Sequence, residues 1–262
     1  MTSRPRPAHL TSENAAAFQL TGVVADYHLR TPYPAALGGF LRDLMMPSGG
    51  TAIDLGCGTG ELARIIARYA KRVDAVDVSA PMLERARAMT TAESNPIRWI
   101  HSRSEEVDLD GPYALAIAGD SLHWMNWEIV LPRLAHALAP NAPLAVITAA
   151  VETPWSAALG EVIPKYSVIK DFTRFVLAEE LDARGLLRVV GTTTVRPEPF
   201  ERTVDQYVDA LHATAGLARD RMAPSDVPAF DEAVRRLVQP FAQEGVLRLM
   251  ASAEVAWGIP LA

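Results

Sequence analysis

Hydrophobic and polar positions follow a repeating order from Thr51 to about Val151. Short apolar runs of strand type alternate there with longer segments in which apolar residues recur at helical spacing. The strand-like runs are residues 51–55, 72–78, 97–100, 113–118 and 144–149. The helix-like segments are residues 61–70, 80–89 and 127–138. This alternation is typical of right-handed βαβ units, and it predicts a doubly wound, mostly parallel sheet with helices on both faces.

The order changes after Val151, where helical spacing dominates. Proline lacks the N–H that a helix interior needs, so Pro154 and Pro164 are predicted to break the helical stretch 152–185. Two further helices are predicted at residues 204–221 and 227–244.

Two more strands are predicted in this second part of the chain. Residues 186–196 are rich in valine and threonine and form a strand that ends at Pro197 and Pro199. Residues 246–257 form the last strand. Together with the five earlier runs, these strands predict a seven-stranded sheet.

Length and composition suit one elaborated α/β domain or two small ones. The 262 residues are 49% hydrophobic and 21% charged, which is enough to bury a sizeable core. We expect residues 1–150 to hold N-terminal helices and a cofactor-binding α/β core. Residues 151–262 are expected to add the last two strands of the same sheet and helical insertions that form a lid over the carboxyl ends of the strands.

Charge, cysteine content and apolar run length narrow the functional classes. The formal net charge of −6 argues against nucleic acid as a partner, because phosphate backbones are bound by basic surfaces.

Cys57 is the single cysteine, so no intrachain disulfide or Cys-rich metal site can form, and no His/Asp/Glu cluster has metal-ligand spacing. Pro5 and Pro7 interrupt an N-terminus that lacks the apolar stretch of a secretory signal, and the longest apolar runs are too short to cross a bilayer. We therefore expect a cytoplasmic protein without a membrane partner, of unknown oligomeric state.

A glycine-rich loop is the sharpest chemical feature. The string from Asp54 to Gly60, Asp-Leu-Gly-Cys-Gly-Thr-Gly, comes directly after a predicted strand and directly before a predicted helix. Glycines there allow backbone angles closed to other residues and a close approach of a ligand, and the helix adds unpaired N–H groups. Asp77 ends the next strand about twenty residues after Gly56, where nucleotide-binding folds place a ribose-binding carboxylate.

Two details favour S-adenosylmethionine (SAM) over a dinucleotide. Glu61 stands where the dinucleotide pattern has its third glycine, and Asp54 ends the strand before the loop. A carboxylate at Asp54 would be unfavourable beside a pyrophosphate, whereas it suits the ammonium group of a methionine moiety.

These segments resemble class I SAM-dependent methyltransferases, with a Rossmann-like fold, of the small-molecule branch. Ile53 to Gly60 resembles the first motif of that family. The supporting segments are Val76 to Ser79 with Met82 and Leu83, Ser121 to Trp124, and Tyr27 to Pro34. A string of Asn-Pro-Pro-Tyr type, which nucleic-acid amino-methylating enzymes show after the fourth strand, is absent from the sequence.

The resemblance implies a SAM pocket with assigned roles. The backbone of Gly56 and Gly58 would line the methionine and ribose, Asp54 would lie near the amino group, and Asp77 would bind the ribose hydroxyls. Met82 would pack on the adenine, and Arg30 or Tyr33 would reach the methionine carboxylate. The other residues implied to bind the cofactor are Cys57, Gly60, Val78, Ser104, Glu105 and Asp120. The family pattern of an acidic residue followed by a small one after the third strand is altered at Arg103, which affects the adenine assignment to Ser104 and Glu105.

His123 is the candidate general base, because it follows the fourth strand at the expected rim of the acceptor site. The competing interpretation is a packed histidine beside Trp124 and Trp127, and such tryptophans more often belong to a core or an interface. The sulfonium of SAM already activates its methyl group, so a base is needed only for a protonated, weakly acidic acceptor.

Three functional classes remain open from the sequence. The first is SAM-dependent methyl transfer to oxygen, nitrogen or carbon of a small molecule, with S-adenosylhomocysteine (SAH) as the second product. The second is a protein that keeps SAM binding but works as a cyclase or a ligand-binding protein. The third is a nicotinamide-dependent oxidoreductase, which is favoured only by the βαβ arrangement that both kinds of enzyme share.

Overall fold

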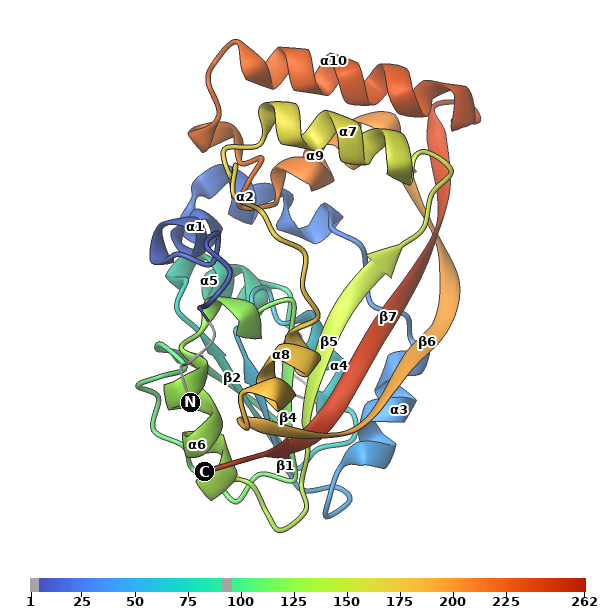
Figure 1. The fold of residues 1–262 in the computed structure, drawn as a ribbon. Helices are drawn as coiled ribbons and strands as arrows, with labels where there is room; N and C mark the ends of the chain where they lie inside the picture. The colour runs from blue at the N-terminus through green and yellow to red at the C-terminus, as the bar shows by residue number, and fades with distance from the viewer. Residues whose placement is uncertain (1–4, 91–95) are drawn as a thin grey trace.

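A seven-stranded sheet with helices on both faces organises the protein in the computed structural model, which describes residues 5–90 and 96–262 (Figure 1). The strands are β1 (Thr51–Leu55), β2 (Arg72–Asp77), β3 (Ile97–His101), β4 (Leu115–Gly119), β5 (Leu144–Val151), β6 (Leu187–Thr203) and β7 (Val246–Pro260). The helices are α1 (Ser12–Ala16), α2 (Thr21–Asp26), α3 (Ala36–Leu44), α4 (Glu61–Ala67), α5 (Ala80–Ala88), α6 (Trp127–Ala137), α7 (Ser156–Tyr166), α8 (Leu177–Ala183), α9 (Val204–His212) and α10 (Asp226–Val238).

The strand order β3-β2-β1-β4-β5-β7-β6 reverses direction between β1 and β4, which flank the switch point of a doubly wound sheet. Pairs among β1 to β5 are parallel, and β7 runs antiparallel to both β5 and β6. One apolar cluster on each face buries the sheet, which is why β1 and β4 read as nearly continuous apolar runs. The predicted mostly parallel seven-stranded sheet is confirmed.

The edge strand β6 is longer than predicted. It pairs with β7 as far as Thr203 and passes through Pro197 and Pro199, so the prediction that these prolines end the strand is wrong. A register shift between Val195 and Glu198 absorbs the first proline, and an edge strand tolerates residues that donate no ladder hydrogen bond. Pro164 likewise lies inside α7, two residues before its end, and does not break it.

The predicted helix 204–221 is also shorter in the structure. It begins with a capping box between Thr203 and Gln206 and ends at His212, after which the chain turns back and forms only a short 3-10 turn at Arg219–Arg221. The helix predicted at 227–244 ends at Val238, just before Pro240.

Helices α7, α9 and α10, called the cap helices below, pack into a third apolar cluster around Phe230 and Val208. Figure 1 shows them stacked above the carboxyl ends of the parallel strands, where the long strands β6 and β7 reach up to them. The N-terminal helices α1 and α2 lie between this layer and α5, and Val23 and Val24 pack there against Met82 and Ala218.

Candidate functional site

A cavity of about 330 Å³ lies at the carboxyl ends of the parallel strands. Its floor comes from the segments that follow β1, β2, β3 and β4, and its cover comes from residues 6–27. The lining residues predicted to bind the cofactor are Gly56, Gly58, Asp77, Val78, Met82, Ser104, Glu105 and Asp120. Segments distant in the sequence therefore meet at one site.

The glycine loop has the conformation that its sequence predicts. Gly56, Gly58 and Gly60 have φ angles of 68°, 54° and 78°, which L side chains rarely adopt. The backbone N–H groups of Gly56 and Cys57 both donate to the Val76 carbonyl, at 2.8 and 2.9 Å. The loop is thereby fixed to the end of β2, where Asp77 follows.

Asp77 is held rigidly at the cavity wall. Its Oδ2 accepts from the Gly58 N–H and its Oδ1 from the Ser79 N–H, both at 2.7 Å. Burial raises the pKa of its carboxyl above the ordinary value, and the hydrogen bonds from Ser79 and Gly58 partly offset this. Each carboxylate oxygen can accept a further hydrogen bond, so this oriented group can also bind ligand hydroxyls.

Asp54 lies beneath the loop and does not line the cavity. Its side chain is buried, and neither carboxylate oxygen has a hydrogen-bond partner among the described residues. Burial, together with the negative charge of Asp77, raises the pKa of Asp54 to about 8. An uncompensated buried carboxylate next to this loop suits a nearby cation, as expected for an ammonium group.

Cys57 and Gly60 face the protein rather than the cavity. The Cys57 thiol packs in the apolar cluster on one face of the sheet, and burial raises its pKa well above the ordinary value. A Cβ on Gly60 would overlap the Trp99 ring, so this glycine allows the loop to pack against β3.

Arg30 and Tyr33 do not line the cavity either. The Arg30 guanidinium donates to the Tyr27 hydroxyl at 3.2 Å and pairs with Asp120 at 3.5 Å, and Tyr27 and Asp120 both line the cavity. Tyr33 borders a second cavity of about 430 Å³ near α3 and α4, and its N–H donates to Glu61 Oε1 at 3.0 Å. Arg30 thus lies one layer behind the wall.

The segment after β3 lines the same cavity as Val78 and Met82. Ser104 is buried, and its carbonyl accepts from Arg133 at 3.1 Å. Glu105 Oε1 accepts from the Asn126 N–H at 2.7 Å, which links this segment to the start of α6. Apolar Val78 and Met82 and polar Ser104 and Glu105 therefore line one cavity.

His123 lies outside the cavity lining, although Trp124 and Met125 belong to it. Its ring is 4.8 Å from the Trp124 ring, and its carbonyl accepts from Arg6 at 2.9 Å. Burial lowers the pKa of His123 to about 4, and the positive charges of Arg30, His9 and Arg6 add to the effect. The imidazole is therefore neutral at neutral pH and is a weak base.

The cover of the cavity was not predicted from the sequence. It consists of residues on α1 and its flanks: Arg6, Leu10, Ser12, Ala15, Ala16, Phe18, Gln19 and Tyr27. One local signal was present, because Thr11 caps α1 by accepting from the Asn14 N–H at 3.1 Å before a run of alanines. No described residue after Asn126 lines this cavity, so the cap helices stand beyond its immediate wall.

The described residues form neither a metal cluster nor a membrane-spanning helix. Among residues 5–90 and 96–262, no group of three or more His, Cys, Asp or Glu side chains is placed to hold a metal ion. Within the same ranges, no helix has both the length and the apolar character required to cross a membrane.

Comparison with known proteins agrees with this geometry. Residues 52–141 match the family described as "Methyltransferase domain". An uncharacterized methyltransferase of Mycobacterium tuberculosis is 36% identical over 111 residues, which are 41% of this chain and 55% of that protein. The chain therefore spans about half the length of this relative. These matches confirm the resemblance of the α/β core to class I SAM-dependent methyltransferases.

Solved structures extend the likeness to most of the chain. A protein of Anaeromyxobacter dehalogenans described as a type II methyltransferase superposes with a TM-score of 0.63 at 19% identity, covering 87% of this chain and 96% of its own. The [4+2]-cyclase SpnF superposes with a TM-score of 0.57 at 17% identity, covering 99% and 98%. At these identities the likeness establishes the fold alone.

Proposed function

We propose that this protein binds SAM in the 330 Å³ cavity and transfers its methyl group to oxygen, nitrogen or carbon of a small-molecule acceptor. The observation that carries the proposal is the convergence of Gly56, Gly58, Asp77 and Asp120 on one cavity at the carboxyl ends of β1, β2 and β4. The match of residues 52–141 to the methyltransferase domain family supports the same reaction class.

The residues present fit SAM. Asp77 has acceptor capacity for ribose hydroxyls, the loop glycines bring backbone close to the cavity, and Met82 and Val78 offer an apolar surface for the adenine. The buried, unpartnered Asp54 has a pKa of about 8 without a ligand, and the ammonium group at the methionine end would favour its ionised form. Arg30, paired with Asp120, adds positive charge behind the wall for the methionine carboxylate.

When bound, SAM supplies a methyl group activated by a sulfonium, so the protein mainly aligns donor and acceptor for an in-line displacement and excludes water. Helix α1 and its flanks cover part of the cavity, which supports both tasks. We keep His123 as the proposed base. Its neutral imidazole can take a proton, and its low pKa restricts that role to acceptors that become acidic during transfer.

Calorimetric titration of the purified protein with SAM, SAH and NAD in parallel tests the cofactor assignment. We expect SAM and SAH to bind with micromolar affinity and NAD not to bind. Binding of NAD without SAM, or of none of the three, would contradict the proposal.

A turnover assay distinguishes a methyltransferase from a protein that binds SAM without transferring its methyl group. A methyltransferase converts SAM to SAH when a suitable acceptor is supplied, whereas a cyclase leaves SAM unchanged. The His123→Ala variant belongs in the same assay, because loss of turnover with intact SAH affinity distinguishes a base from a packed histidine.

A further inference from the structure

Arg6 is a cation at the cavity wall without a carboxylate partner. Its guanidinium lies over the Trp127 ring at 4.3 Å and donates through Nη2 to the His123 carbonyl at 2.9 Å. Its Nε–H is buried and has no acceptor among the described residues. An unmade hydrogen bond of a buried charged donor destabilises the protein, which favours a ligand that supplies the acceptor.

The carboxylates near Arg6 are engaged elsewhere. Glu128 pairs with Arg184 at 3.2 Å, and Glu105 lies 3.6 Å from Arg103 while accepting from the Asn126 N–H. No ion pair of Arg6 within 4.0 Å occurs in the described part of the chain. Glu128 and Glu105 attract the guanidinium from a distance, and neither forms an ion pair with it.

A second unpaired donor lies in the same wall. Trp124 Nε1 is buried and has no acceptor among the described residues, and its ring packs 5.9 Å from Phe18. Trp124 directly follows His123, whose carbonyl binds Arg6, so the two donors belong to one part of the wall. Apolar side chains of the cover complete it: Leu10, Ala15, Ala16 and Phe18.

None of these residues has a role in the proposed SAM pocket, which uses the loops after β1, β2 and β3 together with Asp120. We propose that the methyl acceptor is an organic acid whose carboxylate is bound by Arg6 and Trp124 and whose apolar body packs under α1. This inference rests on the proposed function, because it names the substrate class of the same site. A carboxylate accepts from both donors and neutralises the cation, whereas an amine or a neutral hydrocarbon does neither.

The test uses the full-length protein saturated with SAH and titrated with butanoate, hexanoate, octanoate and 3-phenylpropanoate, each against its amide. We expect at least one acid to bind about tenfold or more tightly than its amide, the scale of a charge-assisted hydrogen bond. The Arg6→Gln variant should lose that preference while its SAH affinity stays unchanged. The Trp124→Phe variant, which keeps an aromatic ring but lacks the N–H, should weaken acid binding by a smaller factor.

Arg42→Gln is the control, because it removes the same charge from an exposed side chain on α3 that pairs with Asp43 at 2.7 Å. The inference is overturned if the acids bind no better than the amides, if no acid binds, or if Arg6→Gln keeps the preference. It is also overturned if Arg6→Gln lowers SAH affinity instead, since Arg6 would then serve the cofactor. Failure of the wild-type protein to bind SAH contradicts the proposed function rather than the acceptor class.

Discussion

At the scale of single residues, the site is built around carboxylates held away from water. Asp54 and Asp77 approach the glycine loop from below and from the side, and burial raises the pKa of both. Asp77 receives two backbone hydrogen bonds, whereas Asp54 receives none within the described chain. Without a ligand, the two carboxylates therefore differ in how much their burial destabilises the folded protein.

Asp54→Asn should flatten the pH dependence of stability. The folded-state pKa of Asp54, about 8, lies above its unfolded value, so its stabilising contribution is present below about pH 4 and is lost as the pH rises through 8. Asparagine does not ionise, and the ligand-free variant should exceed the wild-type protein in unfolding free energy by about 1 kcal/mol or more near pH 9. Urea denaturation at about pH 5, 7 and 9 measures this. Parallel pH profiles would refute it, and the exposed Asp43→Asn serves as control.

Asp77→Ala should weaken SAM binding by about 1.5–3 kcal/mol, the scale of hydrogen bonds to a charged group. The variant also frees the N–H groups of Gly58 and Ser79, so circular dichroism must show that it folds. Calorimetry against Asp108→Ala, an exposed carboxylate outside the cavity, provides the comparison. Equal affinity in a folded Asp77→Ala protein removes the ribose assignment.

Residues close in sequence were predictable at this scale, and distant ones were not. Gly56, Gly58 and Asp77 follow from a motif because a strand, a turn and a helix place them together locally. Arg6 lies 117 positions from its hydrogen-bond partner His123, and no pattern in either segment encodes that contact. The cover of the cavity is therefore the part of the site that the sequence alone did not reveal.

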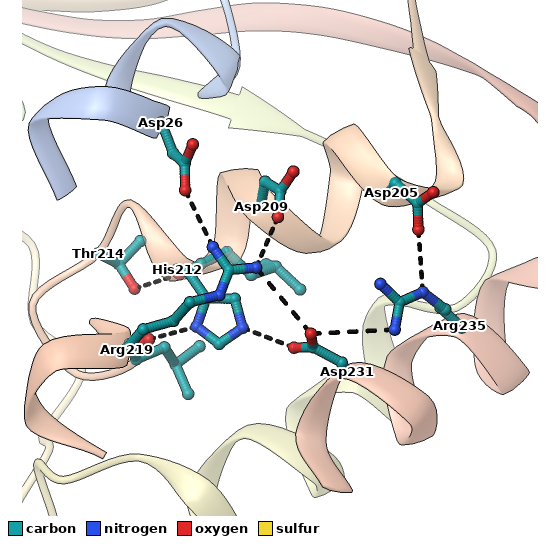
Figure 2. Close-up of polar contacts among 10 residues, drawn as sticks. Asp26, Asp205, Asp209, His212, Thr214, Arg219, Asp231 and Arg235 are labelled. Atoms are coloured by element: carbon teal, nitrogen blue, oxygen red, sulfur yellow. Dashed lines mark hydrogen bonds and ion pairs between the residues drawn. The ribbon is translucent and has the colours of Figure 1, made fainter. Parts of the chain in front are cut away.

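At the scale of elements, an ionic cluster around the buried His212 joins the cap helices to α2 (Figure 2). His212 on α9 has Nδ1 2.6 Å from the Leu217 carbonyl and Nε2 2.7 Å from Asp231 on α10. Both ring nitrogens thus lie at hydrogen-bonding distance from a partner, and the buried ring fixes α9 to α10. Arg219 extends the cluster by pairing with Asp26 of α2 at 3.0 Å and with Asp209 of α9 at 2.5 Å.

Asp231→Asn should destabilise the protein by about 1–3 kcal/mol, because it removes the carboxylate that bonds the buried His212 ring and faces Arg219 and Arg235. Asp205→Asn is the matched control in the same cluster. Its exposed carboxylate pairs with Arg235 at 3.0 Å, and its loss should cost less than about 1 kcal/mol. Thermal and urea denaturation of both variants measure the difference, and similar losses would show that burial of the pair has no energetic weight.

Element types were largely predictable, and element ends were less so. The βαβ alternation between Thr51 and Val151 was correct because buried parallel strands have a distinct apolar pattern. Pro197 and Pro199 misled the prediction, since their effect depends on β6 being an edge strand, which only the assembled sheet decides. The end of α9 depends on the chain folding back onto His212, which is also a tertiary contact.

At the scale of the whole molecule, the protein has two large apolar clusters against the sheet and a separate one among the cap helices. The separation gives the cap its own packing unit, connected to the core mainly through β6, β7 and α2. A unit with its own small core can open without unfolding the sheet.

Hydrogen exchange should show that the cap helices open more readily than the sheet. Amides of α7, α9 and α10 are expected to exchange through a partial opening about tenfold or more faster than amides of β1 and β4. SAH should slow exchange in α1 and in the loop from Gly56 to Gly60, which border the cavity. Uniform protection across cap and sheet would mean that the molecule opens only as a whole.

The hairpin of β6 and β7 bears on how such a protein can diversify. The two strands remain paired up to Thr203 and Val246, and the Val204 N–H donates to the Gly245 carbonyl at 3.0 Å, so the intervening segment leaves and re-enters at adjacent points. Replacing that segment with a shorter turn or with another helical pair would leave every strand and the glycine loop in register. Helices α9 and α10 can therefore be exchanged together as one insertion, provided that the new segment still covers α7, while the sheet and the glycine loop are kept.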